Sequence, residues 1–177
     1  LPCRGSSCRV SSVARLERYW RCPWVRSVLG GQLGADVPVF IHGRNTFAEG
    51  IGESFTDVDL PPATYLVLHP AVNVPTALIF GAPELKRDSV PQRPADWRDG
   101  EGRNDLEAVA CAHFPAIAEH LAWLRQFAPR AMMTGSGSCV FASFAERAAA
   151  AAVLRRLPPG MNGWLADGLS EHPLAFL

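Results

Sequence analysis

Apolar residues in the first half of this chain occur in short runs that end at glycine or proline. The run Val37–Ile41 is closed by Gly43, and the segment Thr46–Gly52 ends in glycine. Short runs bounded by turn residues are typical of strand and turn pieces, and we expect that structure for both segments. Tyr65–His69, stopped by Pro70, is predicted to be a further strand.

The second half of the chain follows helical periods. A proline precedes Thr76–Phe80, which suits a short helix with proline just before its first turn. Asn104 is predicted to cap a longer helix, with Glu107 reaching back to the cap's main-chain N–H in a capping box. Pro115 marks either a break or the first turn of a second helix that ends near Phe127. Apolar residues recur at helical spacing at Leu106, Val109, Ala110, Phe114, Ile117 and Leu121.

The remaining elements predict the fold class. Ala131–Met133 and Cys139–Phe144 have the pattern of strands, Glu146–Leu157 of a helix and Trp164–Ala166 of a last strand. Residues 88–102 are rich in Pro, Arg, Asp and Gly, which is typical of a surface loop. From residue 65 the order is strand, helix, helix, strand, strand, helix, strand. This order predicts an α+β fold, with an antiparallel sheet and helices packed on one face.

Composition narrows the function classes. The 177 residues suffice for one domain, or for one domain and a fragment of another. Seventeen basic residues balance seventeen acidic ones, so we expect no nucleic-acid or membrane-surface partner. The five cysteines are an odd number without zinc spacing, which favours free thiols in a reducing cytosol and a cytoplasmic location. No apolar run approaches the length of a membrane span.

Two short motifs are candidates for chemistry. Thr134–Ser138 is a Gly/Ser loop between two predicted strands, and its main-chain N–H groups can form an anion nest. Spacing alone favours a plain hairpin turn there, because short glycine-rich loops are common. Asp36 lies among small and apolar residues, where it is either a partly buried base or metal ligand, or a turn aspartate bound by neighbouring amides. The residues alone leave those two readings of Asp36 about even.

Taken together, the motifs resemble those of the 4-diphosphocytidyl-2-C-methyl-D-erythritol kinases, small-molecule kinases of the GHMP superfamily. Their order and approximate spacing agree from about Leu33 to Leu174. Each string is weakly specific by itself, whereas the ordered set is highly specific. The strings are Gly34–Phe40, Phe47–Glu53, His69–Pro70, Val74–Thr76, Ile79–Phe80, Asn104–Glu107 and Thr134–Ala142.

The resemblance implies a reaction and a base. The family phosphorylates the 2-hydroxyl of 4-diphosphocytidyl-2-C-methyl-D-erythritol with ATP and Mg²⁺, in the non-mevalonate route to isoprenoid precursors. Asp36 matches the family's catalytic base, which takes the proton from the hydroxyl as its oxygen attacks the γ-phosphate. A carboxylate in that position suits phosphoryl transfer, which depends mainly on positioning and charge stabilisation. The resemblance implies no metal site built from protein side chains.

The resemblance also implies residues that bind the two substrates. Gly135, Ser136, Gly137 and Ser138 match the loop that supports the phosphate-transfer region. Phe80 matches an aromatic residue that stacks on the cytosine, and Thr76 matches a neighbour on the same side of the site. Without the resemblance, an ordinary core aromatic is the better interpretation of Phe80.

The start of the chain departs from the family pattern. The family has a catalytic lysine near its N-terminus, whereas Lys86 is the one lysine here. Of the family's glycine-rich ATP loop, only Gly5, Ser6 and Ser7 fit. Our hypothesis is that residues 1–31 are partly out of frame or eroded, which explains their excess of arginine better than a transit peptide does.

We therefore expect two parts. Residues 1–54 would be a remnant of the kinase N-terminal, ATP-binding domain, and residues 55–177 the GHMP kinase C-terminal domain. Two alternatives remain open: a catalytically inactive C-terminal fragment, or another GHMP small-molecule kinase.

Overall fold

The structure is a computed structural model that describes residues 37–50, 52, 54–91 and 102–173. The chain divides into two compact units. Unit 1 comprises Leu1–Asp59 and Ser170–Leu177, and unit 2 comprises Leu60–Leu169. Among the described residues, none of the helices combines the length and the apolar character needed to cross a membrane.

Unit 1 begins, in its described part, with a helix where we expected a strand. Helix α3 spans Val37–His42. Proline suits the first turn of a helix, because its missing N–H has no partner there, and Pro38 occupies that turn. Gly43 then ends the helix with φ of 75° and donates its N–H to the Val39 carbonyl at 3.0 Å. The prediction of a strand or turn for Val37–Ile41 was therefore wrong.

A hairpin follows in unit 1. Strand β1 (Thr46–Glu49) pairs antiparallel with β2 (Ser54–Asp57), with Glu49 opposite Ser54. A boundary between residues 54 and 55, as we expected, would cut through β2. The units divide after Asp59 instead, which leaves the hairpin whole.

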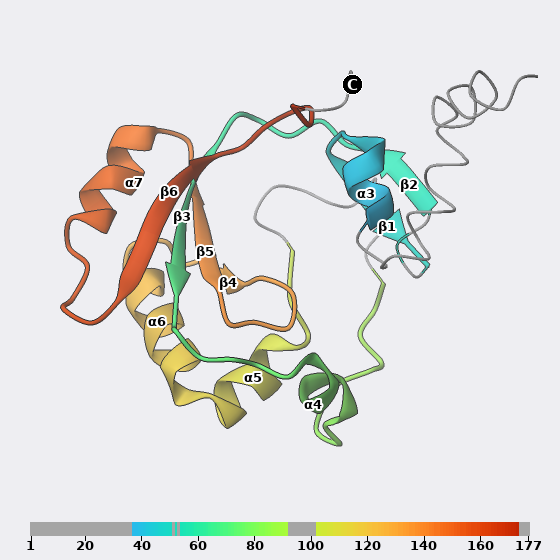
Figure 1. Cartoon of the computed structure of the whole chain (residues 1–177), viewed down its shortest axis with the longest axis horizontal. Coiled ribbons are helices and arrows are strands. Elements are labelled where there is room, and N and C mark those ends of the chain that lie inside the picture. Colours follow the sequence, from blue (N-terminus) through green and yellow to red (C-terminus); the bar gives the residue numbers. More distant parts are fainter. Residues whose placement is uncertain (1–36, 51, 53, 92–101, 174–177) are drawn as a thin grey trace, which may run out of the picture. The chain divides into compact units, whose positions relative to one another are not determined.

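Unit 2 is built on one four-stranded antiparallel sheet. Its strands are β3 (Thr64–His69), β4 (Met132–Met133), β5 (Val140–Phe144) and β6 (Asn162–Asp167), in the spatial order β4-β5-β3-β6 (Figure 1). Helices α4 (Thr76–Gly81), α5 (Glu107–His113) and α6 (Pro115–Arg125) connect β3 to β4, and α7 (Arg147–Leu154) connects β5 to β6. Each crossover skips one strand, which is the arrangement of interleaved split β-α-β units.

The helices of unit 2 pack on one face of this sheet, as an α+β fold requires. Leu66 and Leu68 of β3 are fully buried, whereas the alternate residues Tyr65 and Val67 are only partly buried. Successive side chains of a strand point to opposite faces, so only one face contacts the helices. The core beneath that face contains Leu66, Leu68, Val109, Ala110, Ile117, Leu121, Leu124, Met133, Val140, Ala142 and Val153.

Pro115 sets the position at which α6 begins after α5. Phe114 alone separates the two helices, and Pro115 lies in the first turn of α6. Of the two alternatives for Pro115, the structure therefore has the second helix rather than a simple break.

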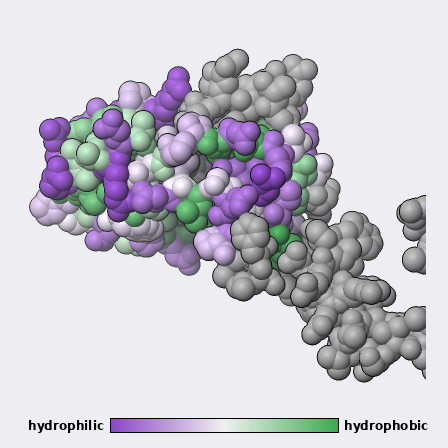
Figure 2. Space-filling model, turned by 90° about the horizontal axis from the view of Figure 1, so that it is seen from above, coloured by the Kyte–Doolittle hydropathy of each residue, from purple (hydrophilic) through white to green (hydrophobic). Residues whose placement is uncertain are grey.

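On the molecular face drawn in Figure 2, hydrophilic and hydrophobic residues are mixed.

Candidate functional site

The glycine-rich loop of unit 2 connects the edge strand β4 to β5. The Thr134 N–H donates to the Cys139 carbonyl at 3.0 Å, and the Gly137 N–H donates to the Thr134 carbonyl at 3.0 Å. Within the described part of the chain, the N–H groups of Gly135, Ser136 and Ser138 donate to no main-chain carbonyl. Donors left over in a tight turn are what an anion nest requires.

Both glycines of the loop have positive φ, 56° at Gly135 and 96° at Gly137. A Cβ at Gly137 would also lie 3.0 Å from Met133 Sδ and 3.3 Å from Ile117 Cδ1. The backbone therefore packs directly on the core at this point. Gly137 is required for its conformation and for its small size.

One of the two predicted substrate residues, Thr76, lies beside this loop. Helix α4 starts at Thr76, whose hydroxyl lies 3.1 Å from the Ser136 hydroxyl, within hydrogen-bonding distance. Phe80 follows four residues later, on the same helical face. Its side chain is 50% exposed, whereas the neighbouring Ile79 is fully buried. Phe80 is therefore not a core aromatic, and it lies one helical turn after Thr76, the residue of α4 that contacts Ser136.

Asn104 is a residue of this region that sequence reasoning placed only as a helix cap. Its Oδ1 accepts the Leu106 N–H at 3.0 Å, as a cap does. Its Nδ2 donates to the Met133 carbonyl at 2.9 Å and to the Gly135 carbonyl at 2.8 Å. The signal in the sequence was the Asn104–Glu107 string, which motif matching alone could not connect to the loop about thirty residues away.

The predicted capping box does not form. The Glu107 carboxylate accepts from Arg125 Nη2 at 2.7 Å and from the Met133 N–H at 3.0 Å. Arg125 and Met133 offer an ion pair and a main-chain donor that lie far away in the sequence, so tertiary contacts outcompete the local bond. The prediction for Glu107 was therefore wrong, although Asn104 does cap the turn before α5.

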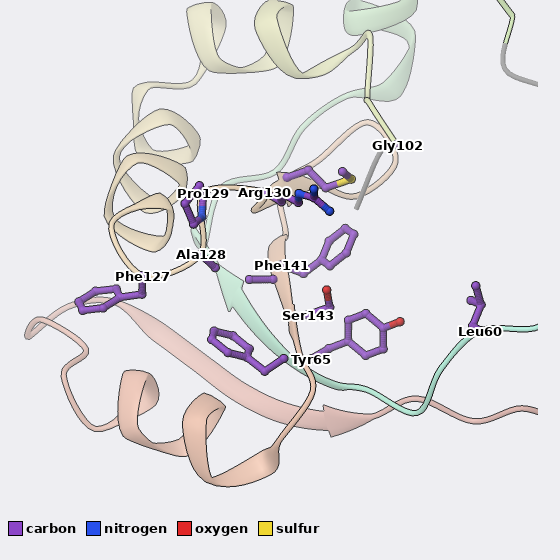
Figure 3. Close-up of a pocket in the computed structure, with 12 residues that line it drawn as sticks. Leu60, Tyr65, Gly102, Phe127, Ala128, Pro129, Arg130, Phe141 and Ser143 are labelled. Atoms are coloured by element: carbon purple, nitrogen blue, oxygen red, sulfur yellow. The ribbon is translucent and has the colours of Figure 1, made fainter. Parts of the chain in front are cut away.

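The face of the sheet opposite the helices carries a separate, largely apolar pocket of about 610 Å³. Tyr65, Phe141 and Ser143 project on the same side of β3 and β5 (Figure 3). The rings of Tyr65 and Phe141 lie 6.0 Å apart between centroids, and Arg130 also lines the pocket. The volume falls in the range of small-molecule sites.

The pKa shifts in unit 2 arise from burial and from directly neighbouring groups. The Thr64 hydroxyl and then the Arg147 guanidinium hold the pKa of the Asp167 carboxyl below its usual range. The pKa of Glu84 is lowered by a main-chain hydrogen bond and by His113. Burial raises the pKa of the Cys111 thiol, which makes it a poor nucleophile at neutral pH. Among the described residues no group of three or more His, Cys, Asp or Glu side chains is arranged to hold a metal ion.

Four predicted site residues lie outside the described residues: Asp36, Gly5, Ser6 and Ser7. Their positions relative to the glycine-rich loop stay predictions. The other six predicted site residues are described, and their positions are given above: Gly135, Ser136, Gly137, Ser138, Thr76 and Phe80.

Several known proteins that are similar to this chain are named as kinases. Residues 84–161 match the family model described as GHMP kinases C terminal. The 4-diphosphocytidyl-2-C-methyl-D-erythritol kinase of Dechloromonas aromatica (strain RCB) is 63% identical over 174 residues, covering 97% of this chain and 64% of that protein. The kinase of the same name from Nitrosospira multiformis is 47% identical, covering 96% of this chain and 60% of its own length.

A solved structure agrees with these matches. The crystal structure of a 4-(cytidine 5'-diphospho)-2C-methyl-D-erythritol kinase superposes with a TM-score of 0.67 at 30% identity, covering 80% of this chain and 56% of that one. The chain thus spans less than two thirds of the length of these relatives. Because the match to the Dechloromonas protein covers 97% of this chain, it also reaches into residues 1–31, where the family motifs are hardest to recognise.

Proposed function

We propose that this chain belongs to the GHMP kinases and supplies the C-terminal part of an ATP-dependent kinase acting on 4-diphosphocytidyl-2-C-methyl-D-erythritol. The product would be the 2-phosphate, an intermediate in the non-mevalonate route to isoprenoid precursors, made in the bacterial cytoplasm. The observation that carries the proposal is the extent of identity to kinases of that name, which runs along almost the whole chain.

The proposed reaction assigns one step to each part. Asp36 takes the proton of the 2-hydroxyl while that oxygen attacks the γ-phosphorus of ATP, and the bond to the bridging oxygen breaks to release ADP. Mg²⁺ bound to ATP would neutralise charge on the phosphates. Main-chain donors aimed at a phosphate in a site that excludes water stabilise the charge that develops. The loop at Gly135–Ser138 has such donors to offer.

The cytidine end of the substrate is proposed to bind at α4. Phe80 is exposed enough to stack on a pyrimidine ring, and base stacking of this kind contributes roughly 1–3 kcal/mol. Thr76 lies one helical turn before Phe80, and its hydroxyl is 3.1 Å from the Ser136 hydroxyl of the loop. This order of groups suits a ligand with a base at one end and a phosphoryl acceptor at the other.

A phosphorylation assay tests the proposal. We expect little or no turnover by the 177-residue chain, because it has one lysine, Lys86, and only Gly5, Ser6 and Ser7 fit the ATP loop. Losing one oriented donor costs about a hundred- to a thousandfold in rate. Joining the chain to a complete nucleotide-binding half should restore ATP-dependent formation of the 2-phosphate.

The Asp36→Asn variant of that restored protein should lose most of its turnover, whereas Asp88→Asn, the same change at an exposed loop residue, should not. If the restored protein binds both substrates without transferring phosphate, the inactive-fragment alternative is favoured. Transfer to a different alcohol would favour another GHMP kinase.

A further inference from the structure

Strand β4 has one residue whose main chain faces away from the sheet. The bond from the Thr134 N–H to the Cys139 carbonyl makes those two residues a hydrogen-bonded pair. Bonded and non-bonded pairs alternate along an antiparallel ladder, so the next pair, Met133 and Val140, is non-bonded. The N–H and the carbonyl of Met133 therefore point outward from the edge of the sheet, where unpaired groups are costly if buried.

Two side chains, one at the start of α5 and one just before it, satisfy both of these groups. Glu107 accepts the Met133 N–H at 3.0 Å, and Asn104 donates to the Met133 carbonyl at 2.9 Å. Arg125 braces the arrangement, since its Nη2 bonds Glu107 and its Nε donates to the Ala131 carbonyl at 3.0 Å. Two side chains thus take the place that a fifth strand would occupy.

Asn104 extends this contact into the glycine-rich loop. The same Nδ2 that holds the Met133 carbonyl also donates to the Gly135 carbonyl at 2.8 Å. Gly135 has φ of 56°, is exposed, and has open space around the position of a Cβ, so packing does not fix its orientation. The turn bond from the Gly137 N–H to the Thr134 carbonyl and this bond from Asn104 hold its peptide groups instead, and the Asn104 bond is the one made by a side chain to the Gly135 carbonyl.

We propose that Asn104 is a positioning residue that orients the main-chain N–H groups of Gly135–Ser138, with Glu107 fixing the other side of Met133. The Gly135 carbonyl and the Ser136 N–H belong to one planar peptide group. Holding the carbonyl toward Asn104 therefore turns the Ser136 N–H to the opposite side. The claim that an anion binds to these N–H groups rests on the proposed function, whereas the claim about the orientation of the loop does not.

The test uses the ¹⁵N-labelled 177-residue chain and inorganic triphosphate as the probe. Asn104→Asp keeps the oxygen that accepts the Leu106 N–H and removes both donated bonds. We expect the amide resonances of Gly135, Ser136 and Gly137 to move while those of Leu66 and Leu68 stay, and triphosphate binding to weaken about tenfold. Asn104→Ser introduces an uncharged residue that also caps helices well. It should shift the same loop resonances and weaken triphosphate binding, and it provides the test if the Asp variant does not fold.

The matched control is Asn162→Asp, the same change at an exposed position on the opposite edge strand, β6. It should leave the loop resonances and the triphosphate affinity unchanged. A purely capping role for Asn104 would instead shift Leu106 and its neighbours and leave the loop as it was. Loop resonances unchanged in both Asn104 variants would overturn the inference. If the unsubstituted chain fails to bind triphosphate, the anion-binding part of the proposed function fails, and the loop resonances still decide the role of Asn104.

Discussion

At the scale of single residues, Gly137 combines two demands that no other residue type meets together. Its φ is 96°, and a Cβ would lie 3.0 Å from Met133 Sδ. We predict that Gly137→Ala lowers the free energy of unfolding by about 2–4 kcal/mol, with contributions from backbone strain and from overpacking. Urea denaturation of the chain measures this loss.

Gly160 offers a matched control, because its φ is 92° but nothing lies within 4 Å of the Cβ position. Gly160→Ala should cost only the backbone strain, about 1 kcal/mol. Equal losses at Gly137 and Gly160 would contradict the claim that the loop packs on the core.

Phe80 is predicted to act in binding and not in stability. Its side chain is half exposed, so Phe80→Ala should change the unfolding free energy little. Affinity for cytidine diphosphate, measured by titration calorimetry, should fall by a factor that corresponds to roughly 1–3 kcal/mol, because the stacking surface is lost. Phe80→Trp should keep most of the affinity.

Leu78 lies on the same helix and is 45% exposed, so Leu78→Ala removes a comparable apolar surface. An affinity loss as large at Leu78 as at Phe80 would show that α4 as a whole, and not the aromatic ring, supports binding.

At the scale of elements, the stability that side-chain contacts between β3 and β6 contribute is predicted to depend on pH. Asp167 lies opposite Thr64 and accepts its hydroxyl at 2.8 Å, while Arg147 of α7 donates to Asp167 Oδ2 at 2.6 Å. These partners lower the pKa of the folded carboxyl. Its contribution to stability is therefore present above the unfolded pKa of about 3.9 and is lost as the pH falls through the lower folded pKa.

Melting temperatures between pH 7 and pH 2.5 test this dependence. The chain should be more stable than its Asp167→Asn variant at pH 7, and the difference should shrink toward the acid end, as the carboxyl takes up its proton. A difference that stays constant over the whole range would rule out the carboxylate as its source.

At the scale of the whole molecule, unit 2 is predicted to fold without the rest of the chain. Residues 60–169 contain all four strands of the sheet and every residue of the described core. A domain of this size buries enough surface to be stable by itself. The isolated segment should show one cooperative thermal transition by circular dichroism.

Residues 84–161, which match the family model, provide a contrast. This segment lacks β3, the strand that pairs with both β5 and β6, so it should not form the sheet. A cooperative transition in the shorter segment, or none in the longer one, would show that the two-unit division misplaces the boundary of the fold.

The sequence by itself showed the resemblance to the GHMP kinases and predicted the α+β class and most elements of unit 2. Those elements have strong local signals, such as the helical period from Leu106 to Leu121 and the strand pattern at Tyr65–His69. Where the signal is short, local reasoning failed. Val37–Ile41 has an apolar run that suits a strand or a helix, and Pro38 with Gly43 gave the helix its start and its end.

Only the tertiary structure decided which side chains act on the glycine-rich loop. Glu107 has a good local partner in a capping box, yet it bonds Met133 and Arg125. Asn104 reaches Gly135, 31 residues away, and Thr76 reaches Ser136, 60 residues away. Periodicity reports which face of an element is buried, whereas these contacts depend on how the sheet brings distant segments together. A hydrogen bond is made by whichever partner the fold places within about 3 Å, and no local pattern records that distance.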